Sequence, residues 1–393
     1  MRQLRMVQLL EVTFLAMLLP GIATGQSEEN SARRKDESGQ ILPAPLDRSD
    51  AAIPPANPEV VAPSDAPSSQ GLDQQPRINP PPFDGPTPSM TGPAGLMGSP
   101  ILGHMPVMAD YRAFWIPTQP VSGQPTNLWM LRQDLSLIAP VWQDSENELS
   151  ISARLRSEVQ PSDAVFPISR IPLPEELWNI GVGGTYRHRF ANDWIVGGSV
   201  LVGSASDKPF HGWDEMNIGL NTFLRVPQGD HNAWLFTLSY SPTAQISFPL
   251  PGVAFSWAPS DDFRANIGLP FQLMWRPTDD WTLDFSYMLL TSIHARATYH
   301  CWGPIRLYAG YDWENEAYLP VDRPQVKDRL FIYDMRLTAG AQAHLGSHWT
   351  FDLSSGYIFD RFYALGTGSA LSNSDRIHVD PGPFLALDCR LRW

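Results

Sequence analysis

Apolar and polar residues alternate one by one along many segments in the C-terminal part of the chain. The pattern is clearest in the ranges 149–156, 216–226, 281–287, 293–300 and 334–343. A β-strand places residues i and i+2 on the same face, so each range is predicted to form a strand with one apolar and one polar face. No segment shows a convincing period of 3.6 residues. We therefore predict an all-β domain over residues 111–393.

The connections between these predicted strands fall into two classes. Short polar turns lie at 191–193, 228–232, 260–262, 278–280 and 346–347, and long polar connections lie at 158–176, 205–214, 241–251, 314–328 and 361–382. The two classes largely alternate along the chain, as they do in an up-and-down antiparallel meander with one plain rim and one elaborated rim. Between residues 270 and 303 this alternation is blurred, so the strand count is least certain there.

One turn sequence occurs twice. The pattern W-x-P-[ST]-D-D spans 257–262 and recurs at 275–280, one hairpin later. Proline presets the backbone dihedral φ, and aspartate side chains bond nearby backbone N–H groups, so both copies are predicted to be tight turns on the same rim.

Aromatic residues gather at the strand ends beside the short turns. They are Trp194, Trp234, Trp257, Phe263, Trp275, Trp281, Trp349 and Trp393. Tryptophan is enriched at the membrane–water boundary because its ring has an apolar body and a polar N–H. The polar faces of the strands are rich in Gly, Ser, Thr and Asn, which is typical of a closed, polar lumen. These features predict a transmembrane up-and-down antiparallel β-barrel of about 12 to 16 strands, apolar outside and polar inside.

The N-terminal residues have a different composition. A basic start, a short apolar stretch over 12–19 and the small residues 23–25 predict a secretory signal peptide over residues 1–25. Residues 26–110 are rich in Pro, Gly and Ser and contain none of the 14 tryptophans. They are predicted to form a disordered periplasmic linker.

The C-terminus alternates to its last residue. Apolar residues occupy Leu385, Leu387, Cys389 and Leu391 before the terminal Trp393. This tail resembles the assembly signal of Gram-negative outer-membrane β-barrel proteins. The resemblance implies recognition by the barrel-assembly machinery and insertion into an outer membrane. With its paired W-x-P-[ST]-D-D hairpins, the region 111–393 also resembles an uncharacterised family of outer-membrane β-barrel-like domains, which implies a fold and a location but no reaction.

The polar faces carry charged residues that we expect to line the lumen. They are Arg154, Arg187, Arg225, Arg264, Asp284, His294, Arg296, Arg306, Asp334, Arg336, Asp388 and Arg390. Two interpretations stay open. Arginine and aspartate pair across strands and fill a plugged interior, or the arginines line a water-filled pore that prefers anions. The net charge of −13 argues against nucleic-acid binding.

Familiar motifs of catalysis and metal binding are absent from the sequence. The sequence contains no HExxH, no CxxC pair and no GxSxG. A Ser–His–Asp hydrolase could be assembled from Ser286 or Ser292, His294 or His300, and Asp284, but hydrogen bonding inside a lumen is the interpretation we favour. We predict no catalytic, cofactor-binding or metal-binding residues.

The sequence therefore predicts an outer-membrane barrel that acts as a passive channel or as a structural barrel. The alternative is a secreted, soluble β-sandwich-like domain that binds a partner through its long loops, and an enzyme ranks third. The expected partners are outer-membrane lipid and the barrel-assembly machinery.

Overall fold

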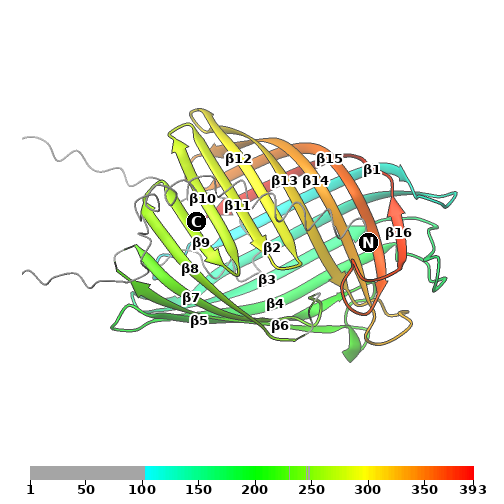
Figure 1. The fold of residues 1–393 in the computed structure, drawn as a ribbon, viewed down its shortest axis with the longest axis horizontal. Helices are drawn as coiled ribbons and strands as arrows, with labels where there is room; N and C mark the ends of the chain where they lie inside the picture. The colour runs from blue at the N-terminus through cyan, green and yellow to red at the C-terminus, as the bar shows by residue number, and fades with distance from the viewer. Residues whose placement is uncertain (1–101, 230, 245, 247) are drawn as a thin grey trace, which may run out of the picture. The chain divides into compact units, whose positions relative to one another are not determined.

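The computed structural model describes residues 102–229, 231–244, 246 and 248–393. The predicted signal peptide and most of the predicted linker lie outside the described residues. The described chain forms one 17-stranded sheet (Figure 1) and one 3-10 turn, Trp213–Glu215. Within these ranges there is no helix long and apolar enough to cross a membrane.

The strands follow one another along the chain with few interruptions. The first eight are β1 (Met108–Pro120), β2 (Asn127–Gln143), β3 (Asn147–Val159), β4 (Glu176–Arg189), β5 (Ile195–Ser206), β6 (Met216–Gln228), β7 (Asn232–Tyr240) and β8 (Leu250–Ser260). The others are β9 (Phe263–Gly268), β10 (Phe271–Thr278), β11 (Trp281–Met288), β12 (Ser292–Trp302), β13 (Ile305–Tyr318), β14 (Arg329–Leu345), β15 (Trp349–Gly366), β16 (Asp375–Val379) and β17 (Gly382–Arg392).

The sheet closes on itself. Each strand from β2 to β16 pairs antiparallel with its predecessor, and β1 pairs with β17, with Met108 opposite Arg392 and Trp115 opposite Leu385. β16 and β17 both pair with β15 and share one place in the wall, so the barrel has 16 strands. The predicted all-β, up-and-down barrel is confirmed, at the upper end of the predicted strand number. A closed single sheet also excludes the two packed sheets of a β-sandwich.

The two rims differ as the sequence predicts. The rim that holds the start of β1 and the end of β17 has only short turns: 144–146, 190–194, 229–231, 261–262, 279–280, 303–304 and 346–348. We call it the short-turn rim. The opposite, long-loop rim carries 160–175, 207–215, 241–249, 319–328 and 367–374, together with shorter connections at 121–126, 269–270 and 289–291.

Large apolar side chains cover the outside of the barrel. The tryptophans that the sequence places at the short-turn rim are 40 to 56 % exposed; they are Trp194, Trp234, Trp257, Trp275, Trp281, Trp349 and Trp393. Phe263, which was predicted to join them, packs against Trp257 with 5.2 Å between ring centroids. Further along the strands, residues such as Leu137, Val200 and Leu353 are exposed on the same outer face. This arrangement is the reverse of a soluble β-protein, which buries its apolar face.

At the long-loop rim, β13 and β15 are longer than the sequence predicts, and β16 lies where a connection was predicted. The stretches 314–318, 361–366 and 375–379 were expected to be connections but lie in strands. Here the outer face is covered as well: Trp313, Phe331, Tyr333 and Phe362 form a buried aromatic cluster. Because both faces of these strand ends are packed, the polar–apolar alternation that marks a half-exposed strand is lost.

Candidate functional site

One hydrogen bond crosses the barrel at the long-loop rim. Directly after β13, the backbone N–H of Leu319 donates to the carbonyl oxygen of Ala205 in β5, at 2.7 Å. β5 and β13 are eight places apart in a ring of sixteen, so they are opposite walls. The lumen is therefore pinched across its middle at this level.

Contacts between two loops reinforce this link. The backbone N–H of Val321 donates to Asp207 Oδ1 at 2.8 Å, and Lys208 Nζ lies 3.4 Å from Asp322 Oδ2. The guanidinium of Arg323 donates to Glu215 at 3.2 Å. The link divides the interior into two parts. We call the inner faces of β14–β17 and β1–β4 the packed half, and the inner faces of β6–β12 the polar half.

The packed half is filled by an apolar core near the long-loop rim. Phe114, Leu128, Leu330 and Phe384 from four wall strands belong to it. The loop 160–175 turns into the barrel and adds Ala164, Phe166 and Leu173 to the same core. The loop is held in place from two sides. The N–H of Val165 donates to Gln124, and the N–H groups of Ile168 and Ser169 donate to the two carboxylate oxygens of Asp375, each at 2.9 Å.

Below this core, charged side chains join strands from both sides of the packed half. Arg132 of β2 donates to Glu158 of β3 at 2.7 Å and lies 3.8 Å from Glu314 and from Glu316 of β13. Arg156 of β3 also reaches Glu316. Glu158 is fully buried and Arg132 is 4 % exposed. A carboxylate or guanidinium at such depth is stable only when it is paired, so these bonds belong to the packing of the interior.

Most of the predicted lumen residues outside the polar half are paired. Arg336 bonds Glu314 at 2.6 Å and lies 3.3 Å from Asp334. Arg390 pairs with Asp110, Asp388 lies 3.6 Å from Arg112, and Arg187 donates to Glu148 at 2.9 Å. Arg154 lies on the inner face of β3 in register with Gly181.

Several of the acidic partners lie where connections were predicted from the sequence. Glu158, Glu314 and Glu316 were assigned to connections, whereas they lie at the ends of β3 and β13. The signal that could have revealed them is the two-residue spacing, extended from Asp312 to Glu314 and Glu316 and from Arg156 to Glu158.

In the wall between β11 and β15, the predicted residues form pairs around Arg296. Asp284 lies opposite Arg296 in the register of β11 and β12. Arg296 donates to Asp352 at 3.1 Å and its guanidinium lies 3.3 Å from the ring centre of Tyr308. Aromatic stacking and a charge-assisted hydrogen bond together fix this side chain against the wall.

His294 is likewise held by the wall. Its Nδ1 lies 2.8 Å from Asp312 Oδ1, while Ser286 is its cross-strand neighbour on β11. Among the described residues, no hydrogen bond joins Ser286 to His294. A nucleophile–base pair of Ser286 and His294 is therefore not formed, and His294 is hydrogen-bonded to the wall through Asp312.

The polar half differs from the packed half near the short-turn rim. Arg225 of β6 and Arg264 of β9 face the lumen, and neither has a carboxylate partner in the described part of the chain. Arg225 lies within electrostatic range of Arg264 and Arg189, and Arg264 is exposed although it is on the inner face. Arg306, the second residue of β13, lies at the same rim. This end of the polar half is basic.

The segment before β1 covers part of the same wall. Leu102 packs with Ile195, Phe223 and Leu235 on the inner faces of β5–β7. Between Leu102 and β1 the segment passes the turn that joins β2 to β3: a Cβ at Gly103 would lie 2.6 Å from the carbonyl oxygen of Asp144, and the N–H of Met105 donates to Gln143 at 2.9 Å. Ile195 and Leu235 are the register partners of Arg225, so the segment narrows the lumen beside the basic end.

No protein-family model matches the chain. No curated protein matches it either. Solved structures similar to it include an outer-membrane channel from Pseudomonas putida F1 (11 % identity, 74 % of this chain and 96 % of that one, TM-score 0.32). They also include OccK7 from Pseudomonas aeruginosa, with 12 % identity over 73 % of this chain and 100 % of that one and a TM-score of 0.34. A third is the translocator domain of the autotransporter NalP from Neisseria meningitidis, with 12 % identity over 76 % of this chain and 90 % of that one and a TM-score of 0.28. At these TM-scores the similarity carries no argument about function, and the barrel is established by its own strand pairing.

Proposed function

We propose that the protein is an outer-membrane barrel whose exposed apolar belt lies in lipid. The tryptophan ring marks one boundary of the membrane, at the short-turn rim, where β1 begins and β17 ends. In barrels of this kind that rim faces the periplasm and the longer loops face the outside. A closed wall leaves no unpaired strand edge for lipid to contact. A lipid-embedded protein stays in the outer-membrane fraction after washing with high salt, whereas a peripheral protein is released.

Within the barrel we propose a narrow passive conduit that runs along the polar half and favours small anions. The observation that carries this proposal is the pair Arg225 and Arg264. An unpaired guanidinium in a dry interior would cost several kcal/mol, so water has to reach both side chains. A water-filled path with unpaired arginines at one mouth attracts anions. The packed half takes no part in conduction and makes the conduit narrower than the ring of strands suggests.

Planar-bilayer recording of the purified full-length protein tests the conduit. We expect small, discrete conductance steps, with a reversal potential in a KCl gradient that shows chloride selectivity. Arg225→Gln with Arg264→Gln should shift the reversal potential toward that of potassium. The control is Lys327→Gln, an exposed positive charge on the loop 319–328, which should leave the reversal potential unchanged.

The second candidate is a structural barrel that conducts nothing. The bond between Leu319 and Ala205 and the core contributed by the loop 160–175 favour it, because both close the interior. The test requires protein that is folded, as shown by heat-modifiable migration in a gel. If such protein gives no conductance in bilayers, the structural barrel is favoured over the conduit.

A further inference from the structure

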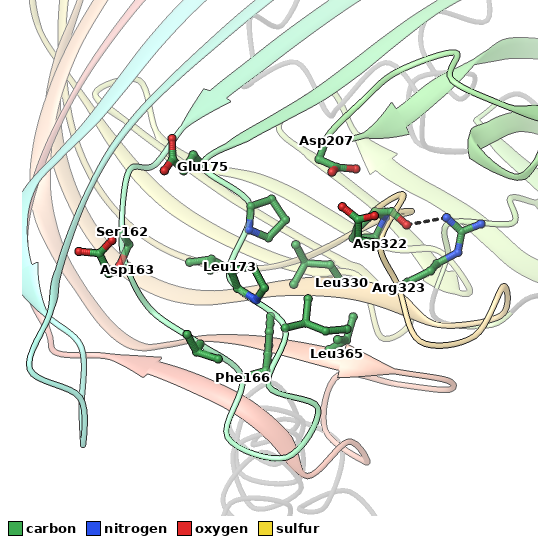
Figure 2. A pocket seen from close by; sticks show the side chains of 15 residues that line it. Ser162, Asp163, Phe166, Leu173, Glu175, Asp207, Asp322, Arg323, Leu330 and Leu365 are labelled. Carbon is green, nitrogen blue, oxygen red and sulfur yellow. Dashed lines mark hydrogen bonds between the residues drawn. The ribbon is translucent and has the colours of Figure 1, made fainter.

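A cavity of about 460 Å³ opens at the long-loop rim (Figure 2). It lies between the loops 160–175, 207–215 and 319–328, beside the link that divides the lumen. The side chains of Phe166, Leu173, Leu330 and Leu365 form an apolar floor, and all four are buried parts of the packed half. Cavities of this volume with an apolar floor and a few polar groups are typical of small-molecule sites.

Carboxylates line the cavity on two sides. Asp163 and Glu175 lie on one side of the apolar floor, and Asp207 and Asp322 lie on the other, as Figure 2 shows. Of the described residues that line the cavity, Arg323 is the one cation. Its guanidinium is already engaged by Glu215 at 3.2 Å and by backbone carbonyl oxygens. The cavity is therefore negative at both ends.

The carboxylates differ in how many hydrogen bonds and ion pairs they form within the protein. Asp207 accepts hydrogen bonds from Val321 and Ser206 and helps to hold the loops together. Asp322 has one partner, Lys208, at 3.4 Å, and both side chains are more than half exposed. The carboxylates of Asp163 and Glu175 are exposed and have no hydrogen-bond or ion-pair partner among the residues that the structure describes. Acceptors therefore remain free on both sides of the floor.

A metal ion does not fit this arrangement. No three His, Cys, Asp or Glu side chains converge on one point anywhere in the described part of the chain. A metal ion needs several oxygen ligands at about 2 to 2.6 Å from one centre, whereas these carboxylates are spread around an apolar surface. The complementary molecule is long, apolar in its middle and positive at both ends.

We propose that this cavity binds an aliphatic diamine or polyamine. Each ammonium group donates hydrogen bonds to the carboxylates of one side, as lysine does in proteins, and the methylene chain lies on Phe166 and Leu365. The ligand joins the loop 160–175 to the loop 319–328, on opposite sides of the cavity. The site is outside the polar half, so the proposal of a diamine site does not depend on the proposal of a conduit.

Isothermal titration of the full-length protein in detergent with 1,5-diaminopentane tests the proposal. We expect saturable binding, with pentylamine weaker by about fivefold because it lacks one of two exposed ion pairs, and 1,5-pentanediol weaker still. Asp163→Asn with Glu175→Gln should weaken diaminopentane by about fivefold, and Asp322→Asn by a similar factor. In each variant the preference for the diamine over pentylamine should disappear.

The matched control is Asp261→Asn, an exposed carboxylate on the short-turn rim, which should leave the affinity unchanged. Equal affinity for the diamine and pentylamine would overturn the proposal. So would the absence of saturable binding, or an equal loss in the control variant, which would indicate unspecific attraction to an acidic surface.

Discussion

The backbone N–H of Leu319 and the carbonyl oxygen of Ala205, 2.7 Å apart, join two strands that face each other across the barrel. In a barrel whose walls touch only their neighbours, these residues would be separated by the full width of the lumen. Ala205, at the β5 end of the link, is fully buried. The division of the lumen follows from this contact.

Removing the donor should loosen the pinch. Leu319→Pro deletes the N–H and should lower the free energy of unfolding by about 1 kcal/mol, the net contribution of one hydrogen bond, and increase the conductance step in bilayers. Leu319→Ala keeps the N–H and serves as the control for loss of the side chain. An unchanged conductance step in the proline variant would show that the link does not limit the passage.

The charged network of the packed half should be a determinant of stability. Glu158→Gln leaves Arg132 and Arg361, its neighbours at 2.7 Å and 3.7 Å, with one carboxylate fewer. We expect a loss of about 3 to 5 kcal/mol, the usual cost of breaking a buried ion pair from one side. The measurement is the heating temperature at which the folded band disappears in a gel. Glu146→Gln, in the exposed turn 144–146, is the control, and an equal shift in both variants would contradict the account.

Two arginines on polar faces should respond differently to the same change. Arg336 is 2 % exposed and bonded to Glu314, so Arg336→Gln should destabilise the barrel without shifting the reversal potential. Arg264 is exposed and unpaired by any described carboxylate, so Arg264→Gln should shift the reversal potential with little change in melting. The reverse outcome would mean that the two halves of the lumen have been assigned wrongly.

The C-terminal residue should act in assembly through its side chain. The backbone of Trp393 exchanges two hydrogen bonds with Val107, at 3.0 and 3.1 Å, and Trp393→Asp leaves both intact. We expect this variant to accumulate in the periplasm, as should a chain that lacks residues 384–393 and with them most of β17. The control is Trp349→Asp, which changes another tryptophan of the short-turn rim, outside the C-terminal tail. If the Trp349 variant assembles normally and the Trp393 variant does not, the assembly signal is confirmed.

Acid should weaken the turn between β2 and β3. The N–H groups of Glu146 and Asn147 donate to the carboxylate of Asp144 at 2.8 and 2.7 Å, and these bonds lower the pKa of Asp144. A lowered pKa in the folded state gives stability that is present above the unfolded pKa of about 3.9 and is lost as the pH falls through the folded value. Asp144→Asn should therefore lose less thermal stability than the natural protein between neutral pH and pH 3. Parallel curves would contradict this.

The sequence predicts the fold where the strands lie in the apolar belt. There, one face meets the exterior and the other a polar lumen, and alternation is unmistakable in the ranges 281–287 and 334–343, which lie in β11 and β14. The prediction from alternation fails where β13 and β15 continue beyond that belt, because both faces of the strands are packed there. Trp313 is buried on the outer face, and its neighbour Glu314 bonds Arg336 on the inner face.

The division of the lumen could not be predicted from the local sequence pattern. The insertion of Phe166 into the barrel depends on contacts with Asp375 and Gln124, far from it in sequence. Nothing in the residues 160–175 themselves distinguishes a loop that fills a lumen from one that projects into water. The sequence pattern predicts which charged residues face the lumen. It does not predict which of them form ion pairs, because several of their partners lie at strand ends that were predicted to be connections.

Accessibility from water tests the division of the lumen most directly. After replacement of Cys301 and Cys389 by serine, one cysteine is introduced at a time. Asn221→Cys lies on the inner face of β6 in the polar half, and Ala386→Cys lies on β17 in the apolar core of the packed half. A membrane-impermeant, negatively charged methanethiosulfonate should label the first within seconds and leave the second unlabelled until the barrel is unfolded. Equal labelling of both positions in the folded protein would contradict a lumen that is packed on one side and open to water on the other.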